Sequence, residues 1–417
     1  MNAIGSNVER TPAPRTSAAA RADSSPALGV WLLVTGDFTP LGGMDRANYA
    51  LADYLARNGA EVHLVSHRVW DDLKEYPNVH VHLAARPWGK HMLGAPLLAT
   101  AGRIWARRLR RLDAGTRVLV NGGNCPAGDD LNWVQYVHAA WRPLASGGIA
   151  ARLKTSLTDV WWRRDERVAL SHARLIIANS DKTRHALIEY LGVPAERVRT
   201  IYYGADADRF PPIDPAERIE ARRELGIDDD RPVIAFVGAM GDRRKGFDTL
   251  YEAWRVFPAE ASGVRARLVV AGAGSSLPYW KERAVREGLG ESIAFLGFRR
   301  DVPRVLAASD LLVSPTRYEA YGLNVQEALC RGLPAIVTAA AGVAERYPEA
   351  LRQLLLNDPD DPAELAGKLA VWRARRNEFK ASAAAFGAAL RTRTWDDCAA
   401  EIVAAALDRS TENPPSC

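Results

Sequence analysis

The feature that most constrains the fold of this chain is a series of short apolar runs, each followed by an amphipathic stretch, which occurs twice. The first series consists of residues 29–34, 61–65, 79–83, 117–120, 133–137, 173–178 and 198–203. The second series consists of residues 232–237, 267–271, 293–296, 311–313 and 335–337. Strands that alternate with helical stretches form βαβ units, which build parallel sheets. The pattern therefore predicts an α/β protein with two doubly wound parallel sheets.

Chain length and one polar segment place the domain boundaries. The 417 residues exceed the roughly 250–300 residues that a single hydrophobic core sustains. Residues 206–230 are polar and contain a Pro-Pro pair, so we interpret them as a linker. We expect a disordered tail over 1–28, an N-terminal domain over 29–212, a C-terminal domain over 213–393, and a returning helix with a short tail over 394–417. Ligands of such sheets bind at the carboxyl ends of the strands, so the site is expected in the cleft between the domains.

Composition excludes several other classes of protein. The chain is 47% hydrophobic and 25% charged with a formal net charge of +5, as in ordinary globular proteins rather than nucleic-acid-binding arms. The first 28 residues lack the apolar core of a signal peptide, and no run of about 18 apolar residues occurs. With four widely spaced cysteines, these features predict a reduced, cytoplasmic protein. The pairs His63/His67 and His80/His82 lack a cysteine or third histidine at ligand spacing, so we expect them to be structural and expect no metal site.

The most informative segment is residues 314–334, which leave a strand, cross a glycine-containing loop and enter a helix. Glu319 lies in the loop, and Glu327 lies about one turn into the helix. Backbone N–H groups that could bind an anion are expected at the helix start, on Gly322, Leu323 and Asn324. The two carboxylates would accept hydrogen bonds from hydroxyl groups, which fits a ligand with both phosphate and sugar. By spacing alone, two solvated helix charges would be the more common explanation.

A second segment carries three consecutive cations, Arg243, Arg244 and Lys245, before a helix that is expected to begin near Phe247. Cations at a helix N-terminus oppose the helix dipole, so they destabilise the helix unless an anion binds there. A diphosphate would relieve this conflict. A solvated basic turn is the alternative for this segment alone.

Together the two segments resemble the retaining glycosyltransferases of family 4, whose two-domain architecture is called GT-B. The E-x7-E signature of this family appears as Glu319 to Glu327, and its basic turn appears as residues 244–246. Residues 357–362 match the family's loop before the late helices, and Trp395 lies in the helix that crosses back to the N-terminal domain in this family. The resemblance covers nearly the whole ordered chain and implies two Rossmann-like domains that face a central cleft.

The resemblance also implies roles for individual residues. Arg244 and Lys245 would neutralise the pyrophosphate of the donor. Glu319 would contact the transferred sugar, and Glu327 would bind the ribose hydroxyls. With His138, which would lie near the sugar, Arg244, Lys245 and Glu319 are the residues expected to be catalytic. The other contacts to phosphate, sugar and acceptor would come from Gly42, Gly43, Gly322, Leu323 and Asn324. Outside the family context, a lone histidine such as His138 is more often structural.

Two departures from the family pattern leave the donor open. An arginine that commonly follows the glycine of the first C-terminal strand is replaced by Ala239, and Arg243 is a candidate to supply the missing charge. The usual Gly-Phe after the first glutamate is Ala320-Tyr321, a change that would reshape the sugar pocket. The resemblance implies a UDP- or GDP-linked sugar as the donor, and these departures leave its identity open.

The implied reaction is a retaining hexosyl transfer from a nucleotide-diphosphate sugar to a glycan or lipid-linked acceptor, in the synthesis of cell-surface polysaccharide or glycolipid. Fixed charges in a water-poor cleft would stabilise the departing diphosphate, so neither metal nor cofactor is expected. We interpret Asp206-Ala207-Asp208 as structural and Asp129-Asp130 as solvated. An epimerase on the same fold and a non-catalytic nucleotide-binding scaffold are the alternatives. A dehydrogenase is disfavoured because Gly272-Ala273-Gly274 lacks the third glycine.

The segment 103–112 contains five arginines and four large apolar residues, Ile104, Trp105, Leu109 and Leu112. As a helix it would form an interfacial surface for an anionic membrane and would place the protein on the inner face of the cytoplasmic membrane. The somewhat favoured alternative is a helix that is packed into its own domain by the same four residues.

Overall fold

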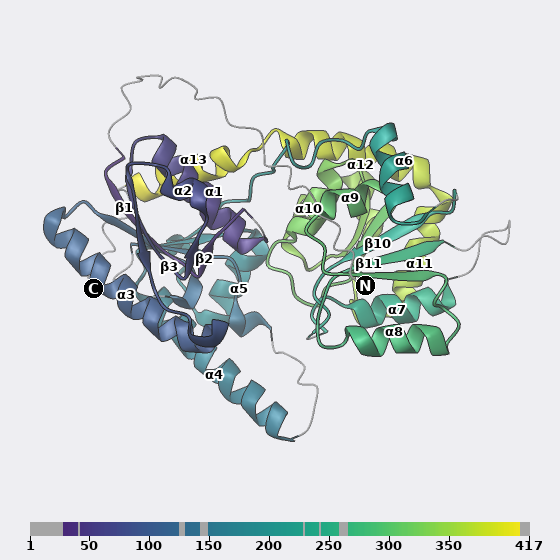
Figure 1. Ribbon diagram of the computed structural model, residues 1–417, viewed down its shortest axis with the longest axis horizontal. Helices are drawn as coiled ribbons and strands as arrows, with labels where there is room; N and C mark the ends of the chain where they lie inside the picture. Colours follow the sequence, from purple (N-terminus) through teal and green to yellow (C-terminus); the bar gives the residue numbers. More distant parts are fainter. Residues whose placement is uncertain are drawn as a thin grey trace, which may run out of the picture.

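A computed structural model describes residues 28–40, 42–124, 130–141, 149–227, 230–241, 243–257 and 266–408. Two α/β domains lie side by side, and each is built around one parallel sheet (Figure 1). The expected tail lies outside the described residues except for Leu28.

The N-terminal domain contains a seven-stranded sheet in the order β5-β3-β1-β6-β7-β8-β9, and all neighbouring strands are parallel. The strands are β1 (Val30–Val34), β3 (Glu61–Ser66), β5 (Val79–Leu83), β6 (Arg117–Val120), β7 (Leu131–Val134), β8 (Leu175–Ala178) and β9 (Val198–Thr200). The helices are α1 (Met44–Arg57), α2 (Asp71–Lys74), α3 (His91–Leu112), α4 (Ile149–His172) and α5 (Asp181–Leu191). A small parallel pair, β2 (Asp37–Phe38) and β4 (Arg68–Val69), lies beside the sheet. The central strands are apolar on both faces because helices cover both sides.

The C-terminal domain contains a six-stranded parallel sheet in the order β12-β11-β10-β13-β14-β15. The strands are β10 (Val233–Val237), β11 (Arg267–Ala271), β12 (Ile293–Gly297), β13 (Leu311–Ser314), β14 (Ala335–Thr338) and β15 (Leu355–Leu356). The helices are α6 (Pro215–Glu224), α7 (Phe247–Val256), α8 (Leu277–Arg286), α9 (Val302–Ala307), α10 (Leu323–Cys330), α11 (Pro362–Ala374) and α12 (Arg376–Arg391). Short 3-10 turns complete the chain as η1 (Pro87–Gly89), η2 (Gly122–Asn124), η3 (His138–Ala140), η4 (Ala195–Arg197), η5 (Gly342–Arg346) and η6 (Glu349–Leu354).

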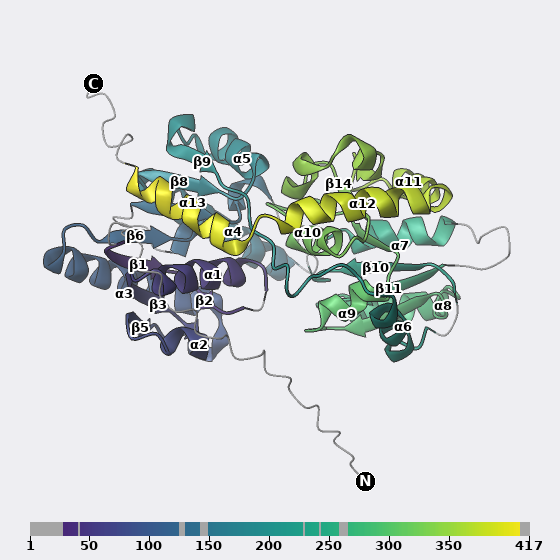
Figure 2. The same cartoon turned by 90° about the horizontal axis from the view of Figure 1, so that it is seen from above.

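The last helix, α13 (Trp395–Leu407), returns to the N-terminal domain. Thr394 begins it with a capping box in which the Thr394 side chain and the Asp397 carboxylate bond to each other's backbone N–H groups. Cys398 and Ile402 are buried in the N-terminal core, whereas the preceding α12 packs on the C-terminal domain (Figure 2). The predicted fold of two Rossmann-like domains with a returning helix is therefore confirmed.

Three local predictions were wrong. The strands expected over 133–137 and 198–203 are shorter, since β7 ends at Val134 and β9 ends at Thr200. The segment interpreted as a linker contains α6, whose N-cap Asp214 accepts a hydrogen bond from the backbone N–H of Ala216 at 2.8 Å.

In the part of the chain that the structure describes, no helix has an apolar stretch long enough to cross a membrane.

Candidate functional site

Two loops lie together at the carboxyl ends of β10 and β13, which are neighbours in the C-terminal sheet. Gly246 allows this approach because a Cβ atom there would overlap the carbonyl oxygen of Pro315, and its φ of +70° is left-handed. The Arg317 N–H donates to the Arg244 carbonyl at 2.8 Å, and the Thr316 hydroxyl donates to the same oxygen at 3.1 Å. The basic turn and the loop that carries Glu319 therefore form one rigid unit.

Within this unit, the Lys245 ammonium forms an ion pair with the Glu319 carboxylate. Arg244 lies 4.0 Å from the same carboxylate oxygen and donates to the Tyr318 carbonyl at 3.2 Å. All three charged side chains are mostly shielded from solvent. The structure thus brings together three of the four residues that the sequence assigned to catalysis.

The N-terminus of α10 adjoins this ion pair. Gly322 precedes the helix with a φ of +112°, which favours glycine, and no side chain caps the first turn. Among the described residues, none accepts a hydrogen bond from the backbone N–H of Leu323 or Asn324. The Asn324 side chain is held by the Val237 carbonyl at 3.1 Å. The first turn of α10 therefore offers free N–H groups to an anion.

Glu327 lies farther along α10 and contacts the other domain. The Arg46 guanidinium of α1 lies 3.7 Å from its carboxylate and also forms an ion pair with Asp206. Arg46 is only 6% exposed and lies over the rings of Phe210 and Trp395. Burial raises the pKa of Glu327 to about 7, and the charges of Arg46 and Arg209 partly oppose this rise.

The glycine pair also lies at the junction of the domains. Gly42 has a left-handed φ of +86°, and Gly43 directly precedes α1. A Cβ atom on Gly43 would lie 3.3 Å from the Leu323 side chain, at the start of α10. The first turns of α1 and α10, one from each domain, are therefore in close contact.

His138 lies on the N-terminal side of the same junction. Its backbone N–H donates to Glu166 at 2.9 Å, and its Nδ1 lies 3.4 Å from that carboxylate, which is fully buried. The His138 ring contacts Tyr136, and the Tyr136 ring contacts Tyr318 of the C-terminal domain. The Val137 N–H donates to the Tyr318 hydroxyl at 2.8 Å. His138 is therefore connected to the loop of Glu319 through one layer of aromatic side chains.

Other residues singled out in the sequence have structural partners. Arg243 donates to Asp248 at 2.7 Å, so its charge is directed to α7 and does not replace the arginine absent at Ala239. Asp206 pairs with Arg46 and accepts from the Arg209 N–H at 3.1 Å. Asp130 accepts from the Val118 N–H and pairs with Arg110, so it is structural rather than solvated, and Asp129 lies outside the described residues.

Four residues of the junction were not predicted from the sequence, namely Arg46, Tyr136, Glu166 and Tyr318. One signal was available for Arg46, which is a cation in the first turn of α1 and opposes the helix dipole as the basic turn does. No comparable signal marks the other three, because each owes its place to contacts with segments distant in the sequence.

Comparisons with known proteins match both domains. The family model described as Glycosyltransferase Family 4 matches residues 41–209, and the model described as Glycosyl transferases group 1 matches residues 217–385. The D-inositol 3-phosphate glycosyltransferase of Geodermatophilus obscurus is 27% identical over 391 residues, or 88% of this chain and 85% of that protein. The uncharacterized glycosyltransferase MJ1607 of Methanocaldococcus jannaschii is 24% identical over 331 residues, or 75% of this chain and 81% of that protein.

Solved structures share the fold over almost the whole chain. WaaG, a glycosyltransferase involved in lipopolysaccharide biosynthesis, superposes with a TM-score of 0.66 at 19% identity, covering 91% of this chain and 99% of its own. Anabaena HepE, solved in complex with UDP and glucose, superposes with a TM-score of 0.62 at 21% identity, covering 91% of this chain and 98% of its own.

Proposed function

The chain belongs to the family 4 glycosyltransferases of GT-B architecture, and we propose that it transfers a hexose from a UDP- or GDP-linked sugar to a glycan or lipid-linked acceptor, with retention of configuration. The observation that carries this proposal is the Lys245–Glu319 ion pair beside the free N–H groups of α10. The cation and the amide N–H groups match the diphosphate of such a nucleotide sugar, and the carboxylate matches the hydroxyl groups of its sugar.

The ion pair also indicates how the site would exchange partners. An incoming diphosphate would take the Lys245 ammonium, with Arg244 beside it. The Glu319 carboxylate would then accept hydrogen bonds from the transferred sugar. Glu327, when ionised, would accept hydrogen bonds from the ribose hydroxyls. Each of these polar groups would thus find a partner on the donor.

In the proposed reaction, the bond between the anomeric carbon and the diphosphate oxygen breaks, and the acceptor hydroxyl oxygen bonds to that carbon on the same face. The acceptor proton passes to the departing phosphate oxygen. Lys245, Arg244 and the α10 amides stabilise the negative charge that develops on this leaving group, so the step requires no metal. His138, which is held by Glu166, would lie beside the transferred sugar.

Acceptor and location belong to the same proposal. The lipopolysaccharide role stated for WaaG supports a lipid-linked acceptor in cell-surface polysaccharide or glycolipid synthesis. The outer side of α3 supports contact with the inner face of the cytoplasmic membrane, because it exposes Leu93, Leu97 and Ile104 in line with Arg107 and Arg111. Of the four apolar residues expected to pack this helix inward, only Leu109 is buried, and Trp105 is partly buried.

The experiment that tests the proposal is the thermal unfolding midpoint of the protein with a panel of nucleotides and nucleotide sugars, in the presence of a chelator. A ligand of the folded state raises the midpoint by mass action. We expect one base to respond, the response to be lost in Lys245→Ala, and the response to persist in Lys281→Ala, which removes an exposed lysine of α8. No shift with any nucleotide would overturn the proposal and would equally exclude the nucleotide-binding scaffold.

The identified donor is then incubated with candidate acceptors. Transfer with retained anomeric configuration, read by NMR of the product, is the expected result. Isomerisation of the donor without an acceptor would instead establish the epimerase alternative.

A further inference from the structure

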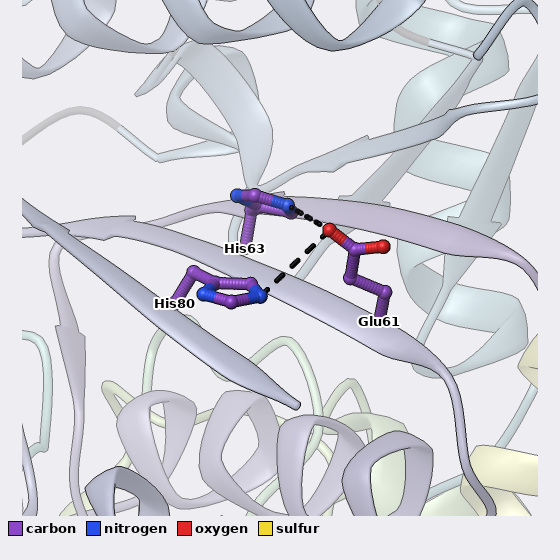
Figure 3. Close-up of side chains that lie close together, drawn as sticks. All are labelled: Glu61, His63 and His80. Atoms are coloured by element: carbon purple, nitrogen blue, oxygen red, sulfur yellow. Dashed lines mark hydrogen bonds and ion pairs between the residues drawn. The ribbon is translucent and has the colours of Figure 1, made fainter. Parts of the chain in front are cut away.

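A compact cluster of ligand-type side chains lies at the edge of the N-terminal sheet, away from the junction of the domains. Parallel pairing of β3 and β5 sets His63 opposite His80, and Glu61 lies on the same face of β3 as His63 (Figure 3). Glu61 Oε1 lies 3.0 Å from His63 Nε2 and 3.7 Å from His80 Nε2. The donor atoms of all three residues lie within 4.8 Å of one another.

These separations suit a metal ion. Bonds of about 2.0–2.1 Å to a tetrahedral zinc ion place neighbouring donor atoms about 3.3 Å apart. The two separations at Glu61 Oε1 lie on either side of this value, so small side-chain rotations would complete the geometry. Two imidazoles and one carboxylate are also a ligand set that zinc commonly takes in proteins.

His82 and Trp105 support the buried member of the cluster, His63. His63 Nδ1 lies 2.9 Å from His82 Nε2, and the His82 ring stacks on Trp105 of α3 at 3.5 Å. Metal-binding histidines typically use their other ring nitrogen in such a hydrogen bond, which fixes the orientation of the ring. Glu61 and His80 are about half-exposed, so an ion could enter from solvent.

We propose that Glu61, His63 and His80 form a binding site for a transition-metal dication, best suited to Zn²⁺, with a water molecule as the fourth ligand. Among the residues that the structure describes, no other group of three or more histidine, cysteine, aspartate or glutamate side chains has this spacing. The sequence pairs His63/His67 and His80/His82 did not indicate it, because the ligands come from both pairs and from Glu61 and meet only through the strand register.

The position of the site defines its role. Glu61 is the first residue of β3, whereas the proposed transfer site lies at the carboxyl ends of the strands. The ion would therefore link the edge strand β5 to β3 beneath α3 and would take no part in hexosyl transfer. Its effect would be on the stability of this edge, because an ion that binds the folded state alone stabilises that state.

The test uses untagged full-length protein that has been stripped with a chelator and is titrated with Co²⁺ and then with Zn²⁺. Tetrahedral Co²⁺ absorbs strongly in the visible range, and Zn²⁺ should displace it. We expect one Co²⁺ per chain with this absorption, and a rise in the unfolding midpoint with Zn²⁺. His80→Ala and Glu61→Gln alter half-exposed side chains, so both variants should fold and should bind the ion at least about tenfold more weakly.

His172→Ala is the matched control, since it removes an exposed histidine at the end of α4 and should bind Co²⁺ as the wild type does. Absence of stoichiometric Co²⁺ binding, or binding only with weak octahedral absorption, would overturn the proposal. Equal affinity in His80→Ala and the wild type would also overturn it, because the ion would then lie elsewhere. Nucleotide binding is read in parallel and should be unchanged in all three variants.

Discussion

The Arg46 guanidinium lies 3.7 Å from the Glu327 carboxylate, and the two residues belong to different domains. Arg46 is in the first turn of α1, and Glu327 is the second glutamate of the E-x7-E signature in α10. The ionisation of the carboxylate that we propose to bind the donor ribose is therefore set partly by a charge on the N-terminal domain. Any change in the relative position of the domains would alter that ionisation.

Arg46→Met should shift efficient use of the donor to higher pH. Burial raises the pKa of Glu327 to about 7, and the Arg46 charge opposes this rise, so its removal should raise the pKa further. A protonated carboxyl group accepts hydrogen bonds from ribose less well. We expect kcat/KM for the donor to fall about tenfold near pH 7 and to recover partly at higher pH.

The measurement is the pH profile of kcat/KM for the donor. Arg57→Met is the control in the same helix, because Arg57 pairs with Asp53 and Asp396 and not with Glu327. An acidic limb at the same pH in Arg46→Met and the wild type would contradict the assignment.

Glu327 should also make the stability of the nucleotide-free protein depend on pH. Its pKa rises from an ordinary 4.5 to about 7 on folding, so the folded state retains a proton that the unfolded chain releases between these values. The corresponding stability is present below about pH 4.5 and is lost as the pH rises to about 7, a change of about 3 kcal/mol. Glu327→Gln cannot ionise, so its free energy of unfolding in urea should fall less over this range. Glu189→Gln, at an exposed position of α5, should follow the wild type.

Gly246→Ala should destabilise the C-terminal domain more than an alanine at a comparable turn. Gly246 and Gly288 have nearly the same left-handed φ, +70° and +71°, but only a Cβ at Gly246 meets another segment, the Pro315 carbonyl. Gly288→Ala should cost about 1–2 kcal/mol for backbone strain alone. Gly246→Ala should cost about 3 kcal/mol or more, because the two loops must also separate. Urea unfolding midpoints compare the two variants, and equal costs would show that the loops are not in tight contact.

Glu166→Gln should impair transfer by misplacing His138. The Glu166 carboxylate accepts from the N–H groups of His138 at 2.9 Å and Ala139 at 3.2 Å. A glutamine would set its own NH₂ group against one of these donors, a buried mismatch of about 1–3 kcal/mol. We expect kcat to fall about tenfold, with nucleotide-induced stabilisation retained. Glu189→Gln again serves as the control, and an unchanged kcat would show that the orientation of η3 does not matter for transfer.

Structural features that depend on residues within one segment could be predicted from the sequence, whereas features that depend on contacts between distant segments could not. The apolar strands and the starts of α7 and α13 were predicted because each depends on a residue pattern within one segment. Helix α6 was missed because it buries only Ala221 and has almost no apolar periodicity, although Asp214-Pro215 is a helix-start signal. The contacts of Tyr318 with Val137, and of His63 with His80, depend on domain packing and strand register, which no local pattern reports.

The exposed side of α3 should bind anionic vesicles. Leu97 and Ile104 are 43% and 58% exposed and lie two turns apart, in line with Arg107, so a membrane would receive apolar groups and cations from one stripe. Burial of one such side chain contributes about 1.5–3 kcal/mol, so Leu97→Glu or Ile104→Glu should weaken binding about tenfold or more.

Cosedimentation with vesicles of phosphatidylcholine and phosphatidylglycerol measures this binding, and neutral vesicles test the contribution of the arginines. Ile219→Glu is the matched control, because Ile219 is 71% exposed on α6 of the other domain. If the three variants sediment alike, the membrane contact lies elsewhere. If binding to anionic and neutral vesicles is equal, the arginines of α3 do not contribute, and only the apolar half of the stripe faces lipid.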